Sequence, residues 1–421
     1  MIKRYLFLLI IAAGCATESS VGPAKAPTFV RYFNTGFDDE AEGLLETADK
    51  KGLVILANTL FPPSTANPST RSKVTLIKTD EFGNRAWQKF YPDSTENKDS
   101  YKGFGINRTA DGGYVIVGEV IQVRAQSGTV ANVTTNRLLF MTVDADGNNP
   151  IIKIMNYPDP IRGRGVDTNA AGNFIVLATV LDQGAKDNIL LTELSKPTLA
   201  PAWTRFYGAG EQFDNALLNL SLPNKLFVDG SGNSFWSGTV RNETSKNYIR
   251  IIQVPTNASA ITARSLSDPA FDEICGDIIR VGLGYGILGT VATSSDSTRI
   301  SVRRLTENGE VLSRQSYSVK VTGGNGNLKG NSLCVAQDGA LVVLGTVGST
   351  TGTDYCLLKV DAFGSATPIW TRVLGGRFDD AGKSVITTAD GGHVVLGTTT
   401  LANVKTILLM KTDKEGKIPG L

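Results

Sequence analysis

Residues 378–416 read FDDAGKSVITTADGGHVVLGTTTLANVKTILLMKTDKEG, and this stretch decides the fold. Three short runs of mainly β-branched and apolar residues predict strands at 384–388, 393–399 and 406–412. The turns at 389–392 and 413–416 contain Asp and Gly, which is typical of antiparallel hairpins. A unit of this size cannot bury both faces of its sheet alone, so further copies are expected elsewhere in the chain.

The same pattern recurs along the whole chain. In every copy the second strand ends in a small residue that follows an apolar run: Ala57, Gly118, Ala178, Gly238, Gly289, Gly345 and Gly397. The period is roughly 50–60 residues, which indicates a repeat architecture. A fourth strand follows most third strands, often with a tryptophan near its start, as at Trp87, Trp203 and Trp370. Four strands in each of seven copies predict an all-β, seven-bladed β-propeller.

The two ends of the chain complete one another. The seventh copy lacks a fourth strand because the chain stops soon after its third. Residues 27–39, PTFVRYFNTGFDD, align without a gap with residues 368–380, PIWTRVLGGRFDD, where Phe29 stands opposite Trp370. We therefore expect residues 29–34 to form the fourth strand of the last blade, which would remove two open sheet edges.

The N-terminal residues predict an exported protein. Lys3 and Arg4 precede an apolar run that is too short to span a bilayer as a mature helix, which is typical of a signal peptide over residues 1–14. The Ala-Ala-Gly before Cys15 resembles the lipobox of bacterial lipoproteins, although Ala12 stands where leucine is usual. That resemblance implies cleavage before Cys15 and its lipidation; ordinary signal cleavage nearby is the alternative. Residues 15–28 would then form a lipidated, flexible tether, and residues 29–421 the propeller.

Charge and composition exclude several classes of function. Removing Lys3 and Arg4 from the 42 basic residues leaves as many as the 40 acidic ones, so nucleic acid is not an expected partner. The single histidine, His393, falls in a repeat position that is apolar in other copies, which indicates packing rather than catalysis or metal binding. We expect no catalytic residues, metal site or cofactor. Cys275, Cys334 and Cys356 are expected to be buried thiols.

Acidic residues recur between the fourth strand of one copy and the first strand of the next. In a propeller these connections lie near the mouth of the central channel. The candidates are Asp38, Asp39, Asp214, Asp272, Asp379 and Asp380. They could bind a cation or act as acids and bases. Their recurrence with the repeat favours a structural role instead, because Asp at such turns accepts hydrogen bonds from backbone N–H groups.

Two connections between the second and third strands are longer than the rest, at 60–73 and 121–136. They belong to neighbouring copies and should lie on the same face as the acids. Variable loops on a rigid scaffold are where recognition usually occurs. They are therefore interpreted as a candidate partner-binding surface, with loops that have no role as the alternative. The candidate residues are Phe61, Pro62, Pro63, Arg71, Arg124, Gln126 and Asn132.

The repeat T-x-D-G-G-Y…L-I-K-x-D-x-x-G-N-x-x-W, seen at 109–114 and 76–87, resembles a broad group of bacterial secreted and lipid-anchored propellers. The resemblance covers nearly all of the chain after Cys15, although copies four and five lose the Asp-Gly-Gly turn. It implies a fold and an envelope location, not one activity. We expect a non-catalytic lipoprotein of the bacterial outer membrane that binds other envelope proteins. The alternative is a glycan-binding protein or carbohydrate-active enzyme that uses the channel mouth.

Overall fold

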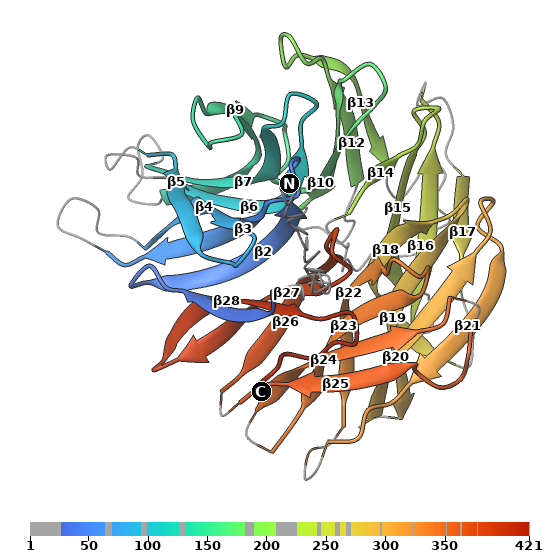
Figure 1. The fold of residues 1–421 in the computed structure, drawn as a ribbon. Coiled ribbons are helices and arrows are strands. Elements are labelled where there is room, and N and C mark those ends of the chain that lie inside the picture. Colours follow the sequence, from blue (N-terminus) through green and yellow to red (C-terminus); the bar gives the residue numbers. More distant parts are fainter. Residues whose placement is uncertain are drawn as a thin grey trace, which may run out of the picture.

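The computed structural model is a ring of seven four-stranded antiparallel sheets (Figure 1). This arrangement confirms the predicted seven-bladed β-propeller. The expected signal peptide, Cys15 and most of the expected tether lie outside the described residues. The structure describes residues 27–63, 70–93, 99–125, 132–181, 189–207, 225–241, 246–256, 262–266, 271–294, 297–321, 324, 326–350, 352–362, 364–376 and 378–420. Within these ranges no helix has the length and apolarity needed to cross a lipid bilayer.

The strands run in sequence order from the centre of the ring to its rim. Blade 1 holds β2 (Asp38–Glu46), β3 (Gly52–Phe61), β4 (Arg71–Asp80) and β5 (Arg85–Tyr91). Blade 2 holds β6 (Ser100–Arg108), β7 (Tyr114–Ala125), β8 (Asn132–Val143) and β9 (Ile151–Met155). Blade 3 holds β10 (Ile161–Thr168), β11 (Phe174–Val180), β12 (Ile189–Leu194) and β13 (Pro201–Tyr207).

The remaining blades follow the same order. Blade 4 holds β14 (Phe227–Val228), β15 (Ser234–Arg241), β16 (Asn247–Val254) and β17 (Thr262–Ser265). Blade 5 holds β18 (Asp272–Val281), β19 (Gly284–Ser294), β20 (Ser297–Leu305) and β21 (Val311–Tyr317). Blade 6 holds β22 (Leu328–Val335), β23 (Leu341–Gly348), β24 (Thr353–Val360) and β25 (Trp370–Leu374). Blade 7 holds β26 (Asp380–Thr387), β27 (His393–Leu401), β28 (Val404–Thr412) and β1 (Phe29–Phe33).

Blade 7 closes the ring with strands from both ends of the chain. Strand β1 pairs with β28 in an antiparallel register that runs from Phe29↔Lys411 to Phe33↔Ile407. The N-terminal strand therefore lies beside the last strand of the chain, as predicted (Figure 1). Pairing both ends in one sheet covers the edge of β28, which would otherwise be open to pairing with another chain.

The hydrophobic core lies between the blades. Among the described residues it divides into seven clusters, one at each junction of neighbouring blades. The cluster between blades 7 and 1, for example, joins Phe29 and Phe33 to Ile55 and Leu409. The inner strands are buried on both faces for this reason; all seven residues of β11 are buried. Each blade is thus stabilised mainly by its two neighbours rather than by itself.

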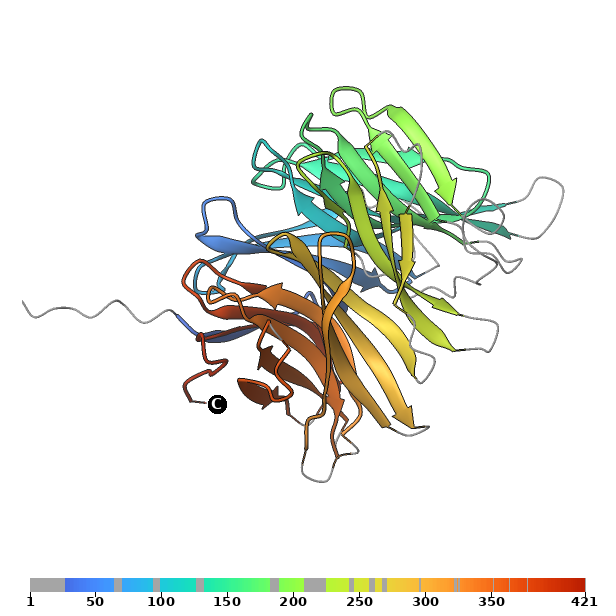
Figure 2. The same ribbon diagram turned by 90° about the vertical axis from the view of Figure 1, so that its right-hand side faces the viewer.

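The strands join at two opposite faces of the ring (Figure 2). The loop face carries the connections between second and third strands and those from one blade to the next. The turn face carries the remaining turns, such as 388–392 and 413–416 in blade 7.

The predicted bounds of the two long loops are wrong. Strands β3 and β4 pair out to Phe61↔Arg71, and β7 and β8 pair out to Ala125↔Asn132. Strand β6 begins opposite Ile121, and β9 ends opposite Leu138. Among the described residues, 122–125 and 132–135 therefore pair only with each other and form a two-stranded ribbon on the loop face. Their β-branched residues suit an extended backbone better than a loop.

Candidate functional site

Three of the acids expected at the channel mouth join neighbouring blades. The backbone N–H of Lys405 donates to Asp38 Oδ1 (2.8 Å), and that of Asn247 donates to Asp272 Oδ1 (3.1 Å). Thr353 N–H donates in the same way to Asp379 Oδ1 (3.1 Å). Each donor lies at the start of the third strand of the preceding blade. These carboxylates thus accept hydrogen bonds from backbone groups at a blade junction.

Other residue types make the same contact at two further junctions. Ser72 N–H donates to Ser100 Oγ (3.2 Å), and Thr298 N–H donates to Asn327 Oδ1 (3.1 Å). The contact therefore requires a side-chain acceptor, not a negative charge. Acids therefore recur at these positions as hydrogen-bond acceptors, and their charge is not what the contact needs. Asp214 lies outside the described residues.

The second acid of each pair is buried in the sheet. Asp39 has no exposed surface and accepts hydrogen bonds from Thr35 N (3.0 Å), Thr35 Oγ1 and Thr59 Oγ1 (2.5 Å). Asp380 occupies the same position in blade 7, is 4% exposed and bonds to the side chain of Thr399. Burial raises the pKa of Asp380 to about 6; the Thr399 hydrogen bond opposes this rise, and the charges of Asp354 and Asp379 add to it.

Replacing Asp380 by asparagine should change how stability depends on pH. The folded-state pKa of about 6 lies above the ordinary value of 3.8, so the folded protein holds this proton more tightly than the unfolded chain. Stability should therefore fall as pH rises from about 4 to about 6. Asp380→Asn removes that loss and should raise the free energy of unfolding by about 1–2 kcal/mol at pH 7, with little change at pH 4. Urea unfolding at several pH values measures this; an effect that is the same at pH 4 and 7 would contradict it.

The first strands of blades 1, 2, 5, 6 and 7 line a central cavity of about 300 Å³. Its charged groups are partly paired: Lys383 Nζ lies 2.6 Å from Glu42 Oε2, and Lys225 Nζ lies 2.6 Å from Asp277 Oδ2. Asp277 also accepts hydrogen bonds from Ser332 Oγ (3.1 Å) and the backbone of Leu333 (2.9 Å). Over the described part of the chain, no group of three or more His, Cys, Asp or Glu side chains is arranged to hold a metal ion.

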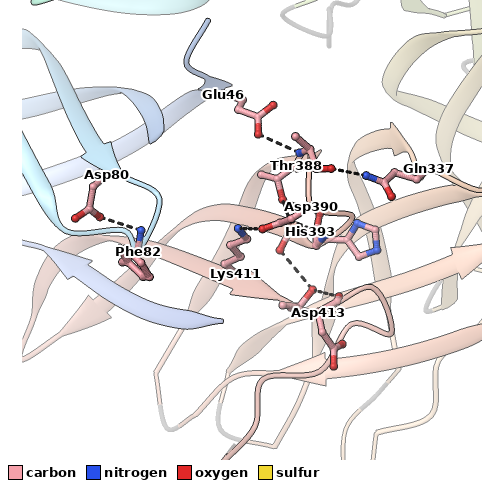
Figure 3. Close-up of polar contacts among 12 residues, drawn as sticks. Glu46, Asp80, Phe82, Gln337, Thr388, Asp390, His393, Lys411 and Asp413 are labelled. Carbon is pink, nitrogen blue, oxygen red and sulfur yellow. Dashed lines mark hydrogen bonds and ion pairs between the residues drawn. The ribbon is translucent and has the colours of Figure 1, made fainter. Parts of the chain in front are cut away.

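His393 lies in the core near the turn face, which confirms its predicted packing position (Figure 3). It is 1% exposed, its ring lies 5.9 Å from that of Trp370, and its Nδ1 is 3.3 Å from Thr387 Oγ1. Burial lowers its pKa, so the imidazole is neutral at pH 7. The turn beside it is held from both neighbouring blades, because Ala389 N–H donates to Glu46 Oε1 (3.1 Å) and Gln337 Nε2 donates to the Ala389 carbonyl (2.7 Å) (Figure 3).

The Trp and Gly residues of the repeat contact one another across blades. A Cβ on Gly147 would lie 2.8 Å from the Trp87 ring, and one on Gly416 would lie 2.7 Å from the Trp370 ring. Phe29 packs in the same way on Gly83 at the junction of blades 7 and 1. These glycines have positive φ, as a turn of this type requires. The two tryptophans are thus packing residues of blade junctions.

Cys275, Cys334 and Cys356 are free thiols; Cys275 and Cys356 are buried as expected, whereas Cys334 is only half-buried. Burial raises the pKa of Cys275 and Cys356 to about 12 and that of Cys334 to about 11. Thiols with such pKa values remain protonated near neutral pH and are poor nucleophiles.

The candidate partner-binding residues lie at the loop face of blades 1 and 2. Phe61 packs between Phe37 (ring centroids 4.8 Å apart) and Phe90 (5.5 Å), and Lys73 Nζ lies 5.6 Å from the Phe61 ring centroid. The next two residues, Pro62 and Pro63, are exposed, and Arg71 at the start of β4 is half-buried. The structure describes only the backbone of Arg124 and Asn132, which lie in the ribbon of blade 2. Gln126 lies outside the described residues.

No family model matches the chain, and no curated protein matches it. Solved structures match the chain at low identity. A Dyadobacter fermentans protein of unknown function is 10% identical over 92% of this chain and 98% of its own, with a TM-score of 0.49. A Mycobacterium tuberculosis puromycin-hydrolyzing peptidase is 12% identical over 89% of this chain and 52% of its own (TM-score 0.49). A subtype N10 neuraminidase-like protein of A/little yellow-shouldered bat/Guatemala/060/2010 is 8% identical over 73% of this chain and 94% of its own, with a TM-score of 0.44. At these values the likenesses carry no argument about activity.

Proposed function

We propose that the protein is a non-catalytic lipoprotein of the bacterial outer membrane whose propeller binds other envelope proteins. The observation that carries this proposal is the ribbon formed by the ends of β7 and β8. Within the part of the chain that the structure describes, its backbone groups pair only with one another, which leaves its edges for a strand from another protein. Blade 1, beside it, presents the aromatic cluster of Phe37, Phe61 and Phe90 on the same face. Together they form the proposed partner-binding surface.

The position of the N-terminus supports this arrangement. Phe29 pairs with Lys411, which immediately precedes the turn at 413–416, so β1 begins at the turn face. A lipid on Cys15 would therefore attach the protein through its turn face. The proposed partner-binding surface on the loop face would then point away from the membrane and remain accessible.

The glycan-binding alternative requires exposed aromatic platforms. Trp87 and Trp370 instead pack on glycines of neighbouring blades, and Trp203 donates a hydrogen bond from Nε1 to Glu193 (2.6 Å). Trp236 has no exposed surface. All four tryptophans of the sequence thus contribute to packing or to contacts within a blade. The tryptophans therefore give the glycan-binding alternative no support; the exposed aromatic side chains are those of Tyr32, Phe82, Phe206 and Phe378 among the described residues.

The proposal predicts that shortening the ribbon abolishes partner capture without affecting folding. Residues 123–134 would be replaced by Asn-Gly, which joins Gln122 to Thr135, a pair already opposite one another in the sheet. Proteins that co-purify with the tagged chain from solubilised membranes should be lost, while the melting temperature stays within a few degrees. Mass spectrometry identifies the co-purifying proteins.

Two control chains separate capture from other effects. Replacing Ala402-Asn403, the tight turn between β27 and β28, by Asn-Gly alters another hairpin on the same face and should leave capture intact. A Cys15→Ala chain should leave the membrane fraction while still binding its partner after extraction. Co-purification that is unchanged by the shortened ribbon would refute the proposal.

A further inference from the structure

A cavity of about 610 Å³ lies between the fourth strand of blade 6 and blade 7. This volume falls within the range of small-molecule sites. Its walls are mostly apolar and come from Val30, Leu374, Leu408 and Met410. Two large aromatic side chains that line it are well exposed, Tyr32 at 55% and Phe378 at 47%. Asp380 and Thr399 supply polar groups to its lining.

The junction between blades 7 and 1 aligns in sequence with the junction between blades 6 and 7, and the comparison explains why this cavity exists. There the segment before the first strand contains Asn34 and Thr35, and Thr35 donates two hydrogen bonds to the buried Asp39. At the junction of blades 6 and 7 the same two positions are Gly375 and Gly376. The buried acid is retained as Asp380, but the side chains that would cover it are missing. A Cβ on Gly376 would meet no atom within 4 Å, so this position adjoins open space.

Asp380 is the carboxylate that lines this polar end, and two further carboxylates lie near it behind the cavity wall. The charges of Asp354 and Asp379 act on Asp380, and among the described residues no cation forms an ion pair with any of the three. Asp354 is 9% exposed, and its buried Oδ1 has no hydrogen-bond partner. This oxygen lies against Gly375 of the cavity wall, where any Cβ would overlap it. The three charges together make this end of the cavity favourable for a cation.

We propose that this cavity binds an organic cation, an ammonium group on an apolar body, with the ammonium directed at Asp380 and the apolar body against the hydrophobic walls. This site is separate from the proposed partner-binding surface and does not depend on it. Asp380 supplies a charge-assisted hydrogen bond to the ammonium group. Tyr32 and Phe378 provide ring faces that attract a cation and cover apolar surface.

Isothermal titration calorimetry with three matched probes tests the charge requirement. The probes are 4-phenylbutylamine, the neutral 4-phenylbutanol and the anionic 4-phenylbutyrate. The amine should bind saturably and at least about tenfold more tightly than the alcohol, and the acid should not bind, because only the amine places a cation beside the carboxylates. Equal affinity for amine and alcohol, or no amine binding at about 1 mM, would overturn the proposal.

Two variants then place the binding in this cavity. Gly376→Thr should fill the space and offer Asp380 the hydroxyl that Thr35 offers to Asp39, and so abolish amine binding. Asp380→Asn should weaken amine binding about ten- to a hundredfold and leave the alcohol unaffected. Asp272→Asn is the matched control, since asparagine already occupies the equivalent position at Asn327, and it should bind like the unmodified protein. If either folded cavity variant binds the amine undiminished, the proposed site is wrong.

Discussion

A chain that begins at Gly36, and therefore lacks β1, is expected not to form a stable propeller. Without β1 the edge of β28 is open, and the core between blades 7 and 1 loses Phe29 and Phe33, which are 5% and 6% exposed. Truncating one buried aromatic side chain typically costs about 3–5 kcal/mol. Two of them, together with a strand pairing, amount to most of the stability of an ordinary protein, about 5–15 kcal/mol.

The control for this truncation is a chain that begins at Pro27 and retains β1. It should unfold in one sharp thermal transition and elute as a monomer, whereas the shorter chain should aggregate or unfold broadly. A synthetic peptide of residues 27–36, added in trans, should restore part of the transition by pairing with β28. An equal melting temperature for the two chains would show that ring closure contributes little.

The closure of the ring could be predicted because one short sequence pattern occurs twice in the chain. The segments 27–39 and 368–380 share their aromatic, basic and acidic positions, so the role of one predicts the role of the other. The ribbon within 121–136 cannot be predicted from the length of this connection relative to the other copies. Its alternation, with Val123 and Arg124 on one strand and Val133 and Thr134 on the other, was the available signal.

The sequence predicts that the acids at the channel mouth accept hydrogen bonds from backbone N–H groups, but not which groups donate them. Their hydrogen-bond donors lie on the preceding blade, 25 residues away for Asp272 and 367 for Asp38, so no local pattern identifies them. The cavity could not be predicted from the sequence for a similar reason. The sequence displays Gly375-Gly376 opposite Asn34-Thr35, but the space that this difference leaves depends on how two blades pack.

Glu273 and Arg303 form a charge pair inside blade 5, and each is 2% exposed. Arg303 Nη2 contacts Glu273 Oε2, and Arg303 Nη1 donates to the Leu266 carbonyl (2.7 Å). Ser301 Oγ donates to the other carboxylate oxygen of Glu273. Glu273 occupies the position that Asp39 holds in blade 1. Here Arg303 on β20 supplies a full positive charge, whereas Asp39 and Asp380 in the same position of blades 1 and 7 receive hydroxyl groups.

Arg303→Met should therefore be among the most damaging single substitutions in the protein. It leaves the buried Glu273 carboxylate with only the more distant Arg314, whose Nη2 lies 3.6 Å from Oε2. Breaking a buried charge pair typically costs about 3–5 kcal/mol, and Arg314 should keep the loss toward the lower end of that range. Adding Glu273→Gln should recover most of that loss, because a neutral amide is far cheaper to bury than an unpaired charge and can still accept from Ser301. Urea unfolding of the two single variants and the double variant measures the coupling between the sites. If the two losses simply added, the pair would not interact as the structure indicates, and the stability of blade 5 would depend on apolar packing alone.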